Sequence, residues 1–234
     1  MDETEKLVAE YLAHRGFSDV VYEPDGNIPP DFLVNGHIAI EARRLNQNHV
    51  ADGKRQGLEE VAIPLWNGLT KIAMSMGPPT RGMSWFVFVR IRRPVEKWKT
   101  LEKKVRTAFT EFISAPSHVE KSVKIGVGVE VVFYPTNHRH DTVFVMAGRV
   151  DRQAGGWLLA ELAKNLQICM DEKLKKIEAV RPKYSEWWLA LEDRIGYGLG
   201  ESEQQQLREL LSPIYGWDKV ILIDPTTCVR SFEL

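Results

Sequence analysis

Apolar residues recur at the spacing of an α-helix in five stretches of this chain. In the first stretch, Leu7, Val8, Tyr11 and Leu12 fall on one side of a helix that would end near Gly16. The spacing predicts helices over residues 4–14, 56–75, 95–113, 158–177 and 202–211. Runs of β-branched and aromatic residues predict strands over residues 19–23, 31–34, 37–43, 85–91, 123–134, 142–150, 187–191 and 219–223.

Two places in this pattern predict β-hairpins. Asn35-Gly36 separates two apolar runs and is the strongest hairpin signal in the chain. The polar segment 135–141 separates the strands 123–134 and 142–150, which predicts a second hairpin. Together the elements predict an α/β or α+β fold with a mixed sheet. A length of 234 residues without a convincing linker predicts one domain over residues 1–234.

Composition is that of a globular chain. Hydrophobic residues make up 44% and charged residues 27% of the sequence, and no window approaches the roughly 20 continuous apolar residues of a membrane-spanning helix. The first residues are acidic and lack the apolar stretch of a secretory leader, which predicts a cytoplasmic protein without a membrane partner. Cys169 and Cys228 lack the spacing of a zinc site and are interpreted as small core residues.

Charge is distributed unevenly, although the net charge is only -1. Residues 1–41 contain nine acidic and two basic residues, whereas residues 90–106 contain eight basic and two acidic residues. Arg90, Arg92 and Arg93 in the basic stretch, together with Arg44, are candidates for contacting a nucleic-acid backbone. The alternative is that the basic stretch is a solvated helix face and strand end.

The residues around the Asn35-Gly36 turn carry the clearest candidate chemistry. Glu41 and Arg43 stand two apart at the end of the second strand, so their side chains share a face. A two-residue loop at 35–36 would pair Asp31 with residue 40 and turn it to the opposite face. A three-residue loop at 34–36, with Gly36 in the left-handed conformation, would pair Asp31 with residue 39 and place it on the face of Glu41.

Two carboxylates on one face of a hairpin can hold a Mg²⁺ ion, which takes oxygen ligands and keeps waters for a substrate phosphate. A structural alternative is a salt bridge between Glu41 and either Arg43 or Arg44 at the sheet edge. A second acidic pair, Glu192 and Asp193, follows the strand 187–191 and is interpreted as loop-facing charge.

Pro30-Asp31, followed on the next strand by Glu41-Ala42-Arg43, forms a pattern that is completed by Glu5 in the first helix. This pattern, over about residues 3–45, resembles the PD-(D/E)XK nuclease superfamily, and the first helix is similar to that of its resolvase-like members. The resemblance implies a restriction-endonuclease-like core with a central mixed sheet flanked by helices. It also implies hydrolysis of phosphodiesters, with Glu5, Asp31 and Glu41 as ligands of Mg²⁺ or Mn²⁺ and the Ala42 carbonyl as a further ligand.

Arg43 stands where the superfamily's pattern has a lysine. A lysine can orient or help deprotonate an attacking water, whereas an arginine stays protonated and acts only as a positive clamp. The preferred interpretation is a metal-dependent nuclease in which Asp31, Glu41 and Arg43 are the catalytic residues. The alternatives are a catalytically inactive nuclease-fold module that binds nucleic acid or a protein partner, and a structural subunit with no nucleic-acid role.

Overall fold

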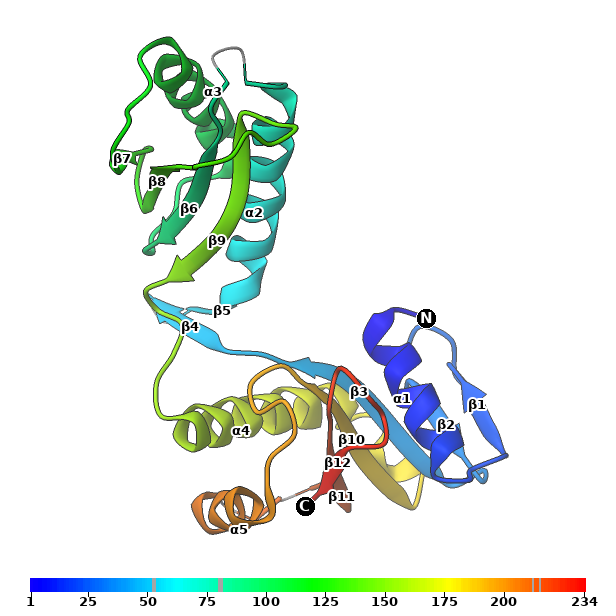
Figure 1. Ribbon diagram of the computed structural model, residues 1–234. Helices are drawn as coiled ribbons and strands as arrows, with labels where there is room; N and C mark the ends of the chain where they lie inside the picture. The colour runs from blue at the N-terminus through cyan, green and yellow to red at the C-terminus, as the bar shows by residue number, and fades with distance from the viewer. Residues whose placement is uncertain (52–53, 80–81, 212, 215) are drawn as a thin grey trace. The chain divides into compact units, whose positions relative to one another are not determined.

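A computed structural model describes residues 1–51, 54–79, 82–211, 213–214 and 216–234. The chain divides into two compact units, the first made of residues 1–48 and 156–234 and the second of residues 49–155 (Figure 1). The sequence predicts one domain over residues 1–234, and a hydrophobic pattern predicts elements without predicting which of them share a core. The candidate metal ligands all belong to the first unit, whereas Arg90, Arg92 and Arg93 belong to the second.

The first unit is built on a six-stranded mixed sheet with the strand order β1-β2-β3-β10-β11-β12. The central strands β3, β10 and β11 are parallel, and β1, β2 and β12 pair antiparallel at the two sides. The bounds of the strands are β1 (Val20–Tyr22), β2 (Phe32–Val34), β3 (Ile38–Leu45), β10 (Glu186–Asp193), β11 (Lys219–Ile223) and β12 (Ser231–Glu233).

Helices cover both faces of this sheet. Helix α1 (Glu3–His14) packs Val8 and Leu12 on one face, and α4 (Leu158–Ile177) and α5 (Glu201–Leu210) pack residues such as Leu166 and Leu207 on the other. A short 3₁₀ helix (Arg181–Lys183) precedes β10. The central mixed sheet flanked by helices confirms the predicted fold class. Within the described residues, no helix has the length and apolar character needed to cross a membrane.

The second unit begins with a two-stranded ribbon of β4 (Asn48–Ala51) and β5 (Lys54–Gly57), of which Asn48 alone is counted with the first unit. Its sheet has the order β7-β8-β6-β9, and helices α2 (Leu58–Ser75) and α3 (Trp98–Ser114) share one hydrophobic core with one face of that sheet. The strands are β6 (Trp85–Ile91), β7 (Lys121–Lys124), β8 (Val129–Pro135) and β9 (Phe144–Asp151).

The predicted hairpin between residues 123–134 and 142–150 is wrong. Strands β8 and β9 do not pair with each other; β8 lies antiparallel and β9 parallel to β6, one on each side. The connection between them is anchored to the segment ahead of β6, because the Thr136 amide donates to the Ser84 carbonyl and the Trp85 amide donates to the Val143 carbonyl. A turn-like composition in this connection did not reveal that it passes the end of a third strand.

Candidate active site

The turn between β2 and β3 puts Asp31 on the same face of the sheet as Glu41. Gly36 has a φ of 71°, the left-handed conformation predicted from the sequence. The strands pair Val34 with Ile38, so the three-residue loop spans 35–37 and not 34–36 as considered from the sequence. Both loop positions give the same side-chain parity, because the register differs by an even number of residues.

Asp31 lies just ahead of β2, and its carboxylate is tied to the neighbouring strand. Asp31 Oδ2 accepts a hydrogen bond from the Ala42 amide at 2.7 Å, and the Asp31 carbonyl accepts one from the Glu23 amide at 2.9 Å. The side chain remains 20% exposed. The carboxylate is therefore held in place beside the end of β3 while one side of it stays open to solvent.

Glu41, in the middle of β3, is completely buried. Its Oε2 atom lies 2.5 Å from Lys173 Nζ and 3.4 Å from Lys176 Nζ, both on α4. Its other oxygen, Oε1, has no hydrogen-bond partner among the described residues. Leaving a buried acceptor unsatisfied costs about 1–3 kcal/mol, and more for a charged group. Glu41 Oε1 is thus the atom of this cluster best suited to receive an added cation.

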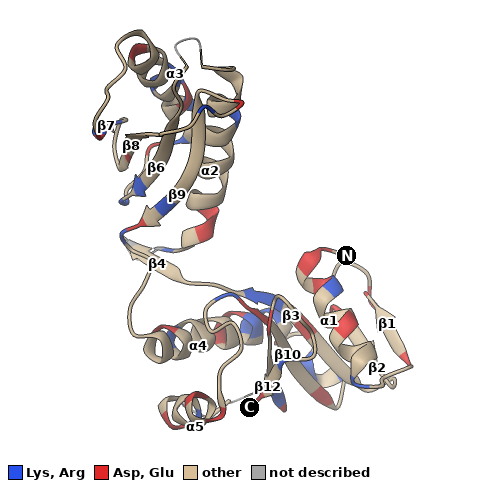
Figure 2. Cartoon of the chain, in the orientation of Figure 1, with Lys and Arg blue, Asp and Glu red and all other residues tan. Residues whose placement is uncertain are grey.

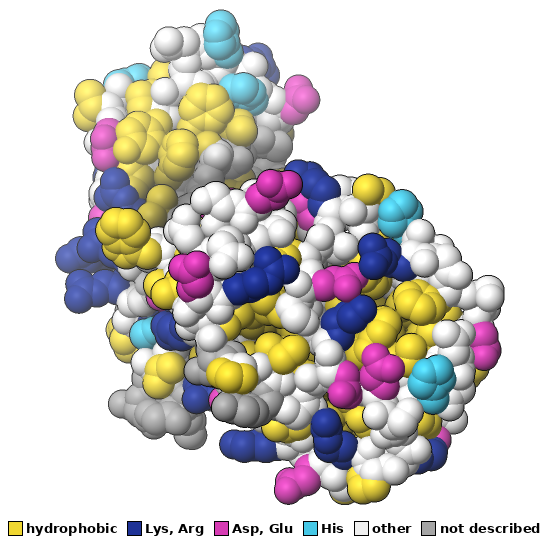
Figure 3. Space-filling model, turned by 90° about the horizontal axis from the view of Figure 1, so that it is seen from below, with side chains coloured by type: hydrophobic (Ala, Val, Ile, Leu, Met, Phe, Trp, Pro, Cys, Tyr) yellow, Lys and Arg dark blue, Asp and Glu magenta, His cyan; other side chains and the backbone are white. Residues whose placement is uncertain are grey.

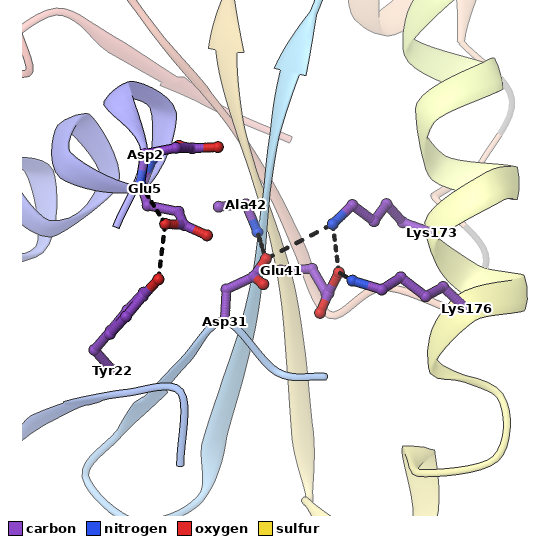
Figure 4. Close-up of polar contacts among 8 residues, drawn as sticks. All are labelled: Asp2, Glu5, Tyr22, Asp31, Glu41, Ala42, Lys173 and Lys176. Carbon is purple, nitrogen blue, oxygen red and sulfur yellow. Dashed lines mark hydrogen bonds and ion pairs between the residues drawn. The ribbon is translucent and has the colours of Figure 1, made fainter. Parts of the chain in front are cut away.

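Lys173 joins the two carboxylates. Its ammonium contacts Glu41 and also lies 3.7 Å from Asp31 Oδ2, with 13% of the side chain exposed. Figure 4 shows Asp31 and Glu41 directed toward this ammonium, which reaches in from α4 beside Lys176. Lys173 was not among the site residues predicted from the sequence. The signal was present, because Lys173 occupies the core-facing stripe of α4 between Cys169 and Ile177, where a charged side chain needs a partner.

Arg43 and Arg44 have partners other than Glu41, contrary to the salt bridge considered from the sequence. Arg43 Nη1 lies 2.6 Å from Glu172 Oε2 on α4. Arg44 Nε lies 3.3 Å from Glu192 Oε2 at the end of β10. Arg43 therefore contributes positive charge at the edge of the site, while the cation in contact with both carboxylates is Lys173.

Glu5 approaches the site from α1 but is held by its own neighbours. Its Oε2 accepts hydrogen bonds from the Asp2 amide at 2.6 Å, in a capping box, and from the Tyr22 hydroxyl at 2.9 Å. Partial burial and the Glu5 carboxylate raise the pKa of Tyr22, so this hydroxyl stays a donor. Figure 4 shows Glu5 on the side of Asp31 away from Lys173. Glu5 is thus directed toward the site, and the described contacts do not join it to Asp31 or Glu41.

A cleft of about 750 Å³ is lined by Asp31 and Lys173 but not by the completely buried Glu41. The N-terminal turn of α1, the end of β3 and the two lysines of α4 line it, so acidic and basic groups face the same space. Among the described residues, no three His, Cys, Asp or Glu side chains are grouped closely enough to hold a metal ion. A cation bound at Asp31 and Glu41 would therefore keep most of its coordination for water or substrate, as Mg²⁺ prefers.

Glu192 and Asp193 are buried and do not face a loop, contrary to the prediction. Each is 2% exposed. Glu192 Oε2 accepts a hydrogen bond from the Thr4 hydroxyl at 2.5 Å, and Oε1 accepts one from Arg194 Nε at 2.6 Å. The Thr4 bond fastens the start of α1, and with it Glu5, above the end of β10. Burial opposes the ionisation of Glu192, but the bonds from Thr4 and Arg194 outweigh it and lower its pKa.

Replacing Thr4 by Val is expected to lower the free energy of unfolding by about 2 kcal/mol at neutral pH, because a bond to a buried charge is lost. A carboxyl whose pKa is lowered by folding stabilises the protein above its unfolded pKa, and this contribution disappears as the pH falls through the folded pKa. Urea unfolding at about pH 7 and about pH 3 should therefore show a smaller loss in acid. Thr107→Val, at an exposed position on α3, is the matched control, and an equal loss at both pH values would contradict the assignment.

The three arginines predicted to contact nucleic acid have different surroundings in the second unit. The Arg93 side chain is 5% exposed. Its guanidinium donates to both oxygens of Asp151 at 2.6 and 2.7 Å and to the Leu58 carbonyl, so it joins the end of β9 to the start of α2. Arg90 is 40% exposed beside Glu130, and Arg92 is exposed. Arg90 and Arg92 alone can reach a ligand in solution without loss of an interior ion pair.

No known protein family, curated protein or solved structure matches this chain. Its function must therefore be inferred from the residues of the cleft and of the second unit.

Proposed function

We propose that this protein is a metal-dependent phosphodiesterase that acts on nucleic acid, with Asp31, Glu41 and Lys173 at its active site. The observation that carries this proposal is the completely buried Glu41 carboxylate, which has one unpartnered oxygen and lies close to Asp31 and Lys173, two residues that line a cleft. A buried anion with unused coordinating capacity is costly unless a bound group uses it. The motif Pro30-Asp31 with Glu41-Ala42-Arg43 gives the same residues, which supports a PD-(D/E)XK-type assignment.

The donor set suits a hard divalent cation such as Mg²⁺ or Mn²⁺. Asp31 and Glu41 would hold it through carboxylate oxygens, and Lys173 and Lys176 contact the opposite oxygen of Glu41, so Oε1 remains available. Two carboxylates are few enough to leave room for phosphate oxygens. A cation bound there would polarise the scissile phosphate and lower the pKa of a water molecule.

Lys173 supplies a lysine ammonium, the group that the superfamily's pattern has at the position of Arg43. Its ammonium has three donors and lies against both carboxylates, so it can hold a phosphate oxygen or orient a water at the same place. Arg43, fixed by Glu172, adds positive charge at the rim and attracts the substrate's phosphates. In this proposal the charged group that assists the reaction comes from α4, and the arginine of the motif has a positioning role.

One observation favours a second function, that of a binding module without hydrolysis. The ammonium groups of Lys173 and Lys176 already neutralise Glu41, and Lys173 also lies near Asp31. In that case the cluster is a structural ion-pair network, and the cleft binds phosphate through the lysines alone.

A cleavage assay separates the two functions. The wild-type protein is incubated with single-stranded, duplex and branched DNA and with RNA, in Mg²⁺, in Mn²⁺ and in EDTA. The nuclease proposal predicts cleavage of at least one substrate with either metal and none in EDTA. Absence of cleavage for every substrate would overturn it and leave the binding module as the better account.

A further inference from the structure

The second unit has one sheet face that its helices do not cover. Strand β6 alternates, with Trp85, Val87 and Val89 in the core against α2 and α3, while Phe86 and Phe88 point to the other face. Phe88 is 38% exposed there. Tyr134 on β8 lies in register with Phe86 and so shares this face. We call Phe86, Phe88, Tyr134 and the adjacent His140 the aromatic face; Figure 3 shows hydrophobic side chains gathered on the surface of this unit.

The rings of the aromatic face are held in fixed positions. Phe88 lies over Gly148 of β9, where an added Cβ would come within 3.2 Å of the ring. It meets Tyr134 edge to face at a centroid distance of 5.4 Å, and Phe86 lies 5.6 Å from the His140 ring. Val132 lies in register with Phe88 and points to the same face, yet it is completely buried. The side chains of this face therefore pack closely around Val132. The result is a closely packed set of rings in which Phe88 keeps an exposed side.

The charge of this unit favours a polyanionic ligand. Residues 49–155 contain 17 Lys and Arg and 10 Asp and Glu, a net charge of +7, whereas the whole chain has a net charge of -1. Figure 2 shows basic residues near the ends of β6 and β9.

Basic side chains also lie beside the aromatic face itself. Arg90 follows Phe88 on the same face of β6. Glu130 of β8 lies in register with Arg90 on one side and with Lys124 of β7 on the other. A bond from Ser122, together with the charges of Arg90 and Arg152, lowers the pKa of Glu130, so this carboxylate is offset by neighbouring arginines. Burial and the nearby Glu120 carboxylate raise the pKa of Tyr134, so its hydroxyl stays protonated.

We propose that the aromatic face of the second unit binds single-stranded nucleic acid, with bases stacked on Phe88 and Tyr134 and phosphates near Arg90, Lys124 and Arg152. Unstacked bases present flat π-surfaces that aromatic rings can cover, whereas the bases of a duplex are stacked on one another and out of reach of a flat sheet. A protein partner would use the apolar rings but would have no general need for the net positive charge. The proposal does not rest on hydrolysis in the first unit.

Binding is measured by fluorescence anisotropy with labelled oligo(dT), oligo(rU) and a duplex of equal length, using the full chain in EDTA so that no cleavage takes place. The wild type should bind both single strands more tightly than the duplex, and its affinity should fall steeply between about 50 and about 200 mM salt. Phe88→Ala and Tyr134→Ala should each weaken single-strand binding by about 5- to 150-fold.

Two further variants distinguish stacking from a structural role. Phe88→Leu keeps an apolar side chain over Gly148 but removes the π-surface, so it should retain the thermal stability of the wild type and still lose binding. Trp157→Ala removes an aromatic residue that is 88% exposed in the first unit and should bind like the wild type.

Unchanged affinity in Phe88→Leu and Tyr134→Ala, or equal affinity for duplex and single strand, would overturn the proposal. So would a wild-type dimer that becomes monomeric in Phe88→Leu, because the aromatic face would then bind a second copy of the chain.

Discussion

Replacing Asp31 by Asn is expected to slow phosphodiester cleavage by about 10³-fold or more, equal to about 4 kcal/mol in the activation free energy. Asn retains an oxygen that can accept the Ala42 amide, but it removes the negative charge that a divalent cation needs. The side chain lies ahead of β2 and outside the apolar cores. Its replacement should therefore change the free energy of unfolding by less than about 1 kcal/mol.

Single-turnover cleavage with saturating Mg²⁺, on the substrate that the wild type cleaves best, measures this effect. Asp171→Asn is the matched control, because Asp171 is an exposed acid of α4 that pairs with Gln167 away from the cleft. The control should cleave at the wild-type rate. Equal rates for Asp31→Asn and wild type would remove Asp31 from the active site.

Replacing Lys173 by Met is expected to destabilise the protein by about 3–5 kcal/mol in the absence of metal, because the buried Glu41 carboxylate loses its closest counterion. A cation that binds only the folded state recovers about 2.7 kcal/mol at a concentration one hundred times its dissociation constant. In the wild type a bound cation would share Glu41 with the ammonium of Lys173. The variant should therefore gain more stability from Mn²⁺ than the wild type does.

Urea unfolding of both proteins, with Mn²⁺ and with EDTA, measures this difference. Lys176→Met is the control: Lys176 is 50% exposed and 3.4 Å from Glu41, so its loss should cost no more than about 1 kcal/mol. The double variant Lys173→Met with Glu41→Gln should be more stable in EDTA than Lys173→Met alone, because it no longer buries an unpaired charge. If Mn²⁺ stabilises Lys173→Met no more than the wild type, the cluster is an ion-pair network and not a metal site.

Local periodicity was enough to predict most elements of the fold, and less of their pairing. The helical spacing of Leu162, Leu166 and Ile177 in α4 gives its extent from the sequence alone, because each residue faces the same core. The pairing of β9 with β6 is not encoded in that way. Apolar alternation is the same whichever neighbour a strand takes, and the backbone bonds that join the β8–β9 connection to Ser84 and Trp85 leave no mark in that alternation.

In the candidate site too, the sequence predicted contacts between residues close in the chain better than contacts between distant ones. Asp31 and Glu41 are ten residues apart in one hairpin, so the sequence left only the length of a short turn to decide whether they share a face, and the three-residue loop places them together. Lys173 is 132 positions from Glu41, and only the packing of α4 on the sheet brings them together. Glu5 was predicted to join the two carboxylates. Its carboxylate instead accepts hydrogen bonds from the Asp2 amide, in a capping box, and from the Tyr22 hydroxyl.

The metal-binding capacity of the Asp31 and Glu41 pair is tested most directly by anomalous diffraction from crystals soaked in Mn²⁺. The account predicts a manganese peak in the cleft, in direct contact with a carboxylate oxygen of Asp31 and with Glu41 Oε1, at about 2.0–2.2 Å from each. The matched Asp31→Asn crystals should lack this peak. A wild-type cleft without manganese at saturating concentration, with Lys173 still bound to both carboxylates, would contradict the assignment of a metal-dependent active site.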